Sequence, residues 1–122
     1  MTNEDLNQMI CETFKKILDL RRVKGGEYSE DNDALSNFRR NAEDLEMEME
    51  AVWRVYAGKH WDALSQYVRD VQSNFKRELS EPIESRIDDL ILYLCLFKAM
   101  VRERRKDDDR RLVEIDVQKA SS

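Results

Sequence analysis

The sequence predicts an all-α protein, and three observations support that fold class. The chain has 122 residues, of which 41% are hydrophobic and 39% are charged. It contains only three Gly and one Pro, so few residues interrupt regular structure. Apolar residues recur at steps of three and four, which is the spacing of amphipathic helices. The length fits one domain of about 100–150 residues.

The first predicted helix runs from Asn3 to Val23, with Thr2 or Asn3 as its N-cap. We expect its apolar stripe to be buried, and Gly25-Gly26 to end the helix, because glycine readily takes the left-handed conformation that closes one. The stripe consists of Leu6, Met9, Ile10, Phe14, Ile17 and Leu18. A loop follows over residues 24–33, and a shorter helix begins near Asp33. That helix carries Leu35, Phe38, Ala42 and Leu45.

A third helix is predicted over Glu48 to Phe75, and a fourth from Pro82 to about Arg104. Proline suits the first turn of a helix, where its missing N–H has no partner to lose. The middle of the fourth helix, LILYLCLFKAM, is apolar on nearly every side, which predicts burial on every side. Four helices of one chain cannot easily surround it, so we expect a second subunit and therefore a homodimer. Residues 1–104 form the predicted domain.

Residues 105–122 form a predicted charged and flexible tail, in which LVEIDV is a candidate short strand or docking segment.

Composition also excludes several classes of protein. No run of about 18 uncharged apolar residues exists, so no membrane span is predicted. A signal peptide begins with basic residues followed by apolar ones, whereas the first residues of this chain are acidic and polar. We therefore expect a cytoplasmic protein. The net charge of −5 disfavours general DNA binding, which depends on clustered Lys and Arg. Cys11 and Cys95 lie in apolar-periodic segments without metal-ligand spacing, which predicts two buried, reduced thiols.

The start of the fourth helix carries the clearest local pattern, four acids in two turns: Glu81, Glu84, Asp88 and Asp89. Acids in a first turn are favoured by the helix dipole and by capping, and this interpretation accounts for Glu81 and Glu84. It accounts poorly for Asp88 and Asp89, which directly precede the most apolar stretch. Carboxylates entering a core need a cation or a basic partner. Mg²⁺ suits several carboxylates on one helix, so these acids are candidate metal ligands.

Other residues suit phosphate or nucleotide chemistry. His60 lies on the apolar stripe of the third helix beside Lys59, as either a core residue or a catalytic one. A lysine next to a metal site suits phosphate oxygens. Arg39 and Arg40 either clamp phosphates or pair with neighbouring acids. Glu27 and Tyr28 are unusual for a plain solvent loop, and Tyr28 is a candidate to pack on a sugar or base.

Several of these motifs together resemble a known family. The acid-rich helix followed by an apolar run with Tyr93 resembles the metal-binding helix of the all-α nucleotide pyrophosphohydrolases, which include MazG proteins and dimeric dUTPases. The motif order is similar to that of small phage and prophage proteins related to the nucleotide-modification-associated MazG-like domains. The matching text is Lys24-Gly-Gly-Glu27-Tyr28, Asn37-Phe38, Lys59-His60-Trp-Asp62 and Glu81-Pro-Ile-Glu84-Ser-Arg-Ile-Asp88-Asp89. The resemblance spans about Leu6 to Met100. For the second carboxylate pair of the family, the chain offers only Glu43 and Glu46.

The resemblance implies a four-helix MazG-like bundle completed by dimerisation, and a phage-encoded protein that binds a nucleotide. The enzymatic hypothesis is Mg²⁺-dependent hydrolysis of a (deoxy)nucleoside triphosphate to the monophosphate and pyrophosphate. Lys59 and His60 are then catalytic, and Mg²⁺ is held by the four acids of the fourth helix. The nucleotide-binding residues are then Glu27, Tyr28, Asn37 and Arg39. The alternative is a non-catalytic protein that sequesters a nucleotide or inhibits a host defence protein.

Overall fold

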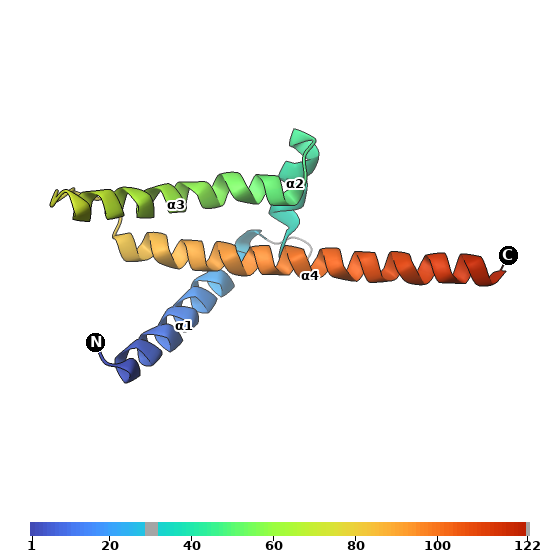
Figure 1. Cartoon of the computed structure of the whole chain (residues 1–122), viewed down its shortest axis with the longest axis horizontal. Helices are drawn as coiled ribbons and strands as arrows, with labels where there is room; N and C mark the ends of the chain where they lie inside the picture. Colours follow the sequence, from blue (N-terminus) through green and yellow to red (C-terminus); the bar gives the residue numbers. More distant parts are fainter. Residues whose placement is uncertain (29–31, 122) are drawn as a thin grey trace.

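In the part of the chain that the structure describes, the regular structure consists of four helices, whose arrangement Figure 1 shows. A computed structural model describes residues 1–28 and 32–121. In chain order the helices are α1 (Asn3–Tyr28), α2 (Ser36–Leu45), α3 (Met49–Gln72) and α4 (Ile83–Ser121). Over these residues all regular structure is helical, so the predicted all-α class is confirmed.

The start of α1 is the predicted one. The Asp5 backbone N–H donates to Thr2 Oγ1 at 3.1 Å, and the Thr2 backbone N–H donates to Asp5 Oδ2 at 3.0 Å. This reciprocal pair satisfies backbone donors that the helix itself leaves free. The predicted end of the helix is wrong, because α1 continues through Gly25-Gly26 to Tyr28. A glycine costs a helix only about 1 kcal/mol, so two of them permit an end without requiring one.

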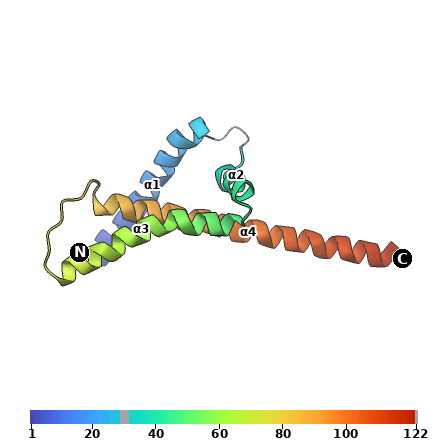
Figure 2. The ribbon, with the colours of Figure 1, turned by 90° about the horizontal axis from the view of Figure 1, so that it is seen from above.

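The core forms where α2, α3 and α4 meet. Six buried side chains define it: Leu35, Phe38, Ala42, Met49, Val52 and Met100. Half-buried Trp53, Tyr56, Tyr93, Leu96, Phe97 and Ala99 pack around them. In both ribbon views α3 and α4 lie side by side, with α2 against their junction (Figures 1 and 2). The first half of the predicted stripe of α3, with Val52, Trp53 and Tyr56, packs in this core, whereas Tyr67, Val68 and Val71 of its second half are exposed.

The stripe of α1 is mostly uncovered, contrary to the prediction. α1 packs on α4 alone, and of its stripe only Ile17 is buried. Phe14 is 50% exposed and Leu18 is 46% exposed. The middle of α4 is also exposed on one side, where Leu94 keeps 54% of its surface. One chain therefore does not cover these faces, and the homodimer remains a prediction.

Two further expectations about α4 and the cysteines are wrong. α4 runs to Ser121, so LVEIDV is helical and forms no strand. Its 39 residues place the charged segment 105–121 in a helix that projects beyond the other three (Figure 1). Cys11 and Cys95 are both free thiols, but they lie exposed rather than in the core.

We predict that Met100→Ala lowers the free energy of unfolding by about 2–5 kcal/mol, because it removes a fully buried side chain and leaves a cavity. Met47→Ala is the matched control, since Met47 is 41% exposed and should change stability by less than about 0.5 kcal/mol. Urea unfolding followed by far-ultraviolet circular dichroism measures both. Equal losses for the two variants would show that the core does not lie at this junction.

Candidate functional site

Two of the residues singled out from the sequence, His60 and Asp89, meet between α3 and α4. His60 follows Val52 and Tyr56 along the face of α3 that packs on α4. On α4, Asp89 and Tyr93 are four residues apart and therefore share one face. His60 Nδ1 lies 3.7 Å from Asp89 Oδ2. The His60 and Tyr93 rings are 5.2 Å apart between centroids, at an interplanar angle of 34°.

His60 is enclosed, whereas Asp89 reaches solvent. The His60 side chain is 13% exposed and the Asp89 side chain 45%. His60 Nδ1 is buried and has no hydrogen-bond partner, since 3.7 Å to the carboxylate exceeds hydrogen-bonding distance. A buried polar atom without a partner is unfavourable, so a ligand, a water or a small movement of Asp89 toward the ring would be stabilising. A carboxylate beside an imidazole is also the arrangement that orients a histidine for proton transfer.

Tyr93 is held by aromatic side chains from two helices. The Phe38 ring meets Tyr93 edge-on at 6.3 Å. The Trp53 indole N–H donates to the Tyr93 backbone oxygen at 2.6 Å. Burial, and then the charge of Asp89 and the neighbouring Tyr56, raise the pKa of Tyr93 above its ordinary value. The phenol is therefore protonated at neutral pH and is available as a hydrogen-bond donor.

Lys59 stands at the solvent edge of this cluster. Its side chain is exposed, and Nζ lies 5.7 Å from the centroid of the Tyr56 ring. That distance allows a cation–π contact while the ammonium stays hydrated. Of the predicted phosphate-binding cations, Lys59 is the one that the structure leaves accessible beside His60.

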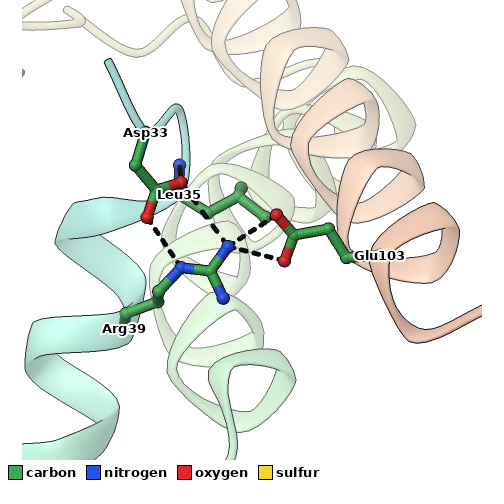
Figure 3. A network of polar contacts seen from close by, with 4 residues as sticks. All are labelled: Asp33, Leu35, Arg39 and Glu103. Atoms are coloured by element: carbon green, nitrogen blue, oxygen red, sulfur yellow. Dashed lines mark hydrogen bonds and ion pairs between the residues drawn. The ribbon is translucent and has the colours of Figure 1, made fainter. Parts of the chain in front are cut away.

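Arg39 is held between two carboxylates (Figure 3). Its Nε donates to Asp33 Oδ2 at 2.7 Å, and its terminal nitrogen donates to Glu103 Oε2 at 2.6 Å. Asp33 also accepts the Leu35 backbone N–H at 3.0 Å. Of the two interpretations of Arg39, the structure shows pairing with neighbouring acids, and it joins α2 to α4.

The other candidate nucleotide-binding residues lie away from His60 or outside the description. Asn37 is exposed on α2, where its side-chain oxygen accepts a hydrogen bond from Arg40 at 3.0 Å. The side chains of Glu27 and Tyr28 lie outside the described residues.

The four acids at the start of α4 diverge. Successive residues of a helix differ by about 100° in direction, so Asp88 and Asp89 address different neighbours. Asp88 lies 3.4 Å from Lys16 of α1, whereas Asp89 lies beside His60 of α3. The remaining two stay near the helix start. Glu81 pairs with Arg86 at 2.9 Å, and Glu84 is exposed. Over the part of the chain that the structure describes, no three His, Cys, Asp or Glu side chains form a metal-binding group.

A cavity of about 490 Å³ opens one turn from the His60 site. It lies between the second half of α3, the connection that follows, and the start of α4. Its wall is both apolar and charged, and includes Ala63, Tyr67, Asp70, Phe75, Arg77 and Arg86. Ala63 follows His60 by three residues and Arg86 precedes Asp89 by three, so the site and the cavity adjoin along both helices.

Asp70 and Arg77 shape the far end of this cavity, and the sequence analysis did not identify them. Arg77 donates to the Asp70 carboxylate from Nε at 2.9 Å and from a terminal nitrogen at 3.2 Å. Gln66 donates to the same carboxylate at 2.9 Å. The sequence feature that could have identified them is the position of Asp70, an acid beside the apolar stripe of α3, because a carboxylate in such a place needs a basic partner.

None of the known protein families, curated proteins or solved structures compared with this chain matches it. Over the described residues, no helix is long and apolar enough to cross a membrane.

The Asp70 site predicts acid sensitivity. Hydrogen bonds from Arg77 and then Gln66 hold the pKa of Asp70 below its ordinary value. The ionised carboxylate therefore stabilises the folded state above about pH 4, and this contribution is lost as the pH falls through the lowered pKa. We predict that Asp70→Asn is less stable than the wild type at pH 7 and that the difference shrinks toward pH 2.

The exposed Asp62, changed to Asn, is the control and should leave the unfolding curves unchanged at each pH. Urea unfolding between pH 2 and pH 7 gives the comparison. A constant difference between Asp70→Asn and wild type across this range would contradict the prediction.

Proposed function

We propose that this chain binds a nucleotide in the cleft between α3 and α4, with the phosphates at Lys59 and His60. One observation carries the proposal: the unpartnered His60 nitrogen lies 3.7 Å from the Asp89 carboxylate, exposed Lys59 is its neighbour on α3, and a cavity opens one turn further along both helices. The cavity volume lies within the range of about 300–1000 Å³ that is typical of small-molecule sites.

The chemistry of the cleft is matched to the two halves of a nucleotide. The Lys59 ammonium is a compact charge that suits phosphate oxygens, and imidazole nitrogens donate to them when protonated. The exposed rings of Tyr67 and Phe75 line the cavity and offer flat faces for a base. Arg77 lies with its guanidinium carbon 5.1 Å from the Phe75 centroid, which holds that ring at the cavity wall.

Binding without turnover is favoured over metal-dependent hydrolysis. The Mg²⁺ expectation needs several carboxylate oxygens around one point. Within the described part of one chain, Glu81, Asp88 and Asp89 lie beside three different basic residues and Glu84 is exposed, so their oxygens do not surround one point as a magnesium site requires. A protein that sequesters a nucleotide needs no such site, and His60 and Asp89 then serve to bind.

The pyrophosphohydrolase hypothesis keeps one supporting observation, the His60–Asp89 pair. A histidine beside a carboxylate is suited to accept a proton from an attacking water. In that hypothesis the pair acts as the base and Lys59 neutralises phosphate charge. Hydrolysis to the monophosphate and pyrophosphate is therefore the second candidate.

The inhibitor form of the non-catalytic hypothesis is favoured by a different surface. Glu43, Asp44, Glu46 and Glu48 are all exposed where α2 ends and α3 begins. Such an acidic surface resembles nucleic-acid phosphates toward a basic partner, and a phage protein with it is suited to block a host defence protein. Retention of such a protein on immobilised wild type, with loss on Glu43→Lys/Glu46→Lys, would support this form.

The nucleotide proposal predicts ligand stabilisation that depends on Lys59. At a concentration one hundred times its Kd, a ligand adds about 2.7 kcal/mol to stability, which is a clear rise in Tm. We expect at least one of the ribo- and deoxyribonucleoside mono-, di- and triphosphates to raise the Tm. We expect Lys59→Gln to weaken its binding about tenfold or more, as loss of one charged hydrogen bond implies.

Lys15→Gln on α1 is the matched control, because it removes the same charge from an exposed helix position outside the candidate site. Thermal shift with and without Mg²⁺ identifies the ligand, calorimetry gives its Kd, and chromatography detects pyrophosphate. Binding without product supports sequestration, and product that disappears in Asp89→Asn supports hydrolysis. A melting temperature that no nucleotide raises, or equal binding by Lys59→Gln and wild type, would contradict the proposal.

A further inference from the structure

The last part of α4 extends beyond the other helices. Residues 105–121 are all exposed, and both ribbon views show them projecting from the body (Figures 1 and 2). Most helices in proteins are stabilised by packing of an apolar face rather than by intrinsic propensity. This projecting helix therefore lacks the packing that ordinarily stabilises one.

The chain as a whole exposes more surface than its size requires. Its accessible area is 10317 Å². A compact monomer of 14.6 kDa exposes about 6900 Å². The excess of about 3400 Å² is more than the roughly 1600 Å² that a stable protein–protein interface buries in total. One interface along the uncovered helices fits within this excess.

A regular stripe runs along the side of α4 that faces away from the core. It alternates steps of three and four residues, which is the spacing of a coiled-coil seam. Its members are Leu94, Lys98, Val101, Arg105, Asp108, Leu112, Ile115 and Lys119. The four apolar members are uncovered, with Leu94 54%, Val101 42%, Leu112 61% and Ile115 41% exposed. The opposite side of the same helix is occupied, since Met100 is buried in the core and Glu103 binds Arg39.

We propose that this stripe pairs with the same stripe of a second copy of the chain, antiparallel, about a two-fold axis between Lys106 and Asp107. In such an isologous contact both subunits use the same surface. If a residue of one subunit faces a second residue of the other, the same two residues also meet with the subunits exchanged. Val101 then faces Leu112 of the partner subunit. Arg105 faces Asp108 of the partner subunit, so both polar positions at the centre of the seam are paired.

The charges next to the seam are complementary on one edge. Only residues beside the seam reach the partner subunit, so Glu103 and Arg110, which lie on the opposite side of the helix, take no part. Beside the seam, Arg102 approaches Asp109 of the partner subunit. On the other edge Arg104 approaches a partner arginine, but Glu48 and Glu50 already neutralise it through bonds of 2.7 and 3.0 Å.

A parallel pairing of the same stripe is disfavoured by the same charges. In register, a parallel seam would place Arg105 against its own copy and Asp108 against its own copy. Like charges brought together at an interface cost free energy and act against that arrangement. The sequence therefore distinguishes the two orientations.

The packing of α1 leaves room for the proposed partner. The antiparallel overlap covers residues 94–119, which is about 39 Å of helix. α1 packs on α4 beside Ile87, Asp88 and Ile91, just before the overlap begins. The helix of the partner therefore ends where α1 begins, and the α3–α4 cleft lies on another side of α4. The inference is independent of the proposed nucleotide site.

Sedimentation equilibrium of the full chain from about 5 to 200 µM tests the pairing through a charge exchange. We expect a dimer for wild type, and at least a tenfold weaker dimer for Arg105→Asp or Asp108→Arg. The double variant R105D/D108R should restore the dimer, because it exchanges the two members of each pair. Arg110→Asp is the matched control, since it makes the same charge change on the side of the helix away from the seam, and it should behave as wild type.

Oxidative cross-linking gives the orientation. In a background with Cys11 and Cys95 replaced by Ser, we expect V101C/L112C to form disulfide-linked dimers and V101C alone to form none. Any one of four results would overturn the proposal. These are a wild type that stays monomeric at every concentration, an Arg105→Asp dimer as tight as the wild-type dimer, a double variant whose dimer stays weak, and disulfide cross-linking by V101C alone. Circular dichroism of every variant confirms that a loss of dimer is not a loss of folding.

Discussion

Tyr93 is the residue on which both the core and the candidate site depend. Its ring packs edge-on against Phe38 of α2 at 6.3 Å and lies against His60 of α3, while its backbone oxygen accepts the Trp53 indole N–H. Three helices are therefore positioned by one side chain and its carbonyl. A site built on packed helices is held more precisely than one on loops. The distance between His60 and Asp89 is set by this packing, so the unpartnered imidazole nitrogen is a property of the core.

Two arginines form ion pairs that join the helices around the core. Arg39 bridges Asp33 and Glu103, and Arg104 bridges Glu48 and Glu50, each across a helix junction. These pairs hold the pKa of Asp33 and of Glu50 below the ordinary carboxyl value through hydrogen bonds from the arginines. They lie at partly exposed positions, so each adds orientation more than stability. The consequence for function is that these arginines are unavailable to phosphate, which leaves Lys59 as the accessible cation of the cluster.

The sequence predicted features that depend on local chemistry. Thr2 caps α1, Pro82 directly precedes α4, and the three-and-four spacing identified Val52, Trp53 and Tyr56 as residues that pack toward α4. It also singled out His60, Asp89 and Tyr93, which meet in space. Prediction from the sequence was wrong where two local conformations have similar free energies. Gly25-Gly26 permit a helix end but do not force one, and the charged segment after Arg104 is compatible with a helix or with a flexible tail.

The acids of α4 show a different limit. Spacing predicts which side chains share a strip of one helix, but not which neighbouring helix supplies a cation. Asp88 turns to Lys16 because α1 crosses α4 there, and Asp89 turns to His60 because α3 does. Both depend on tertiary packing that no single helix encodes. The same limit holds for the uncovered stripe of α4, where the sequence predicted burial for Leu94 and a strand or docking segment for Leu112 and Ile115. Its burial depends on a second chain, and the opposite charges of Arg105 and Asp108 are the part of that interface that the sequence already contains.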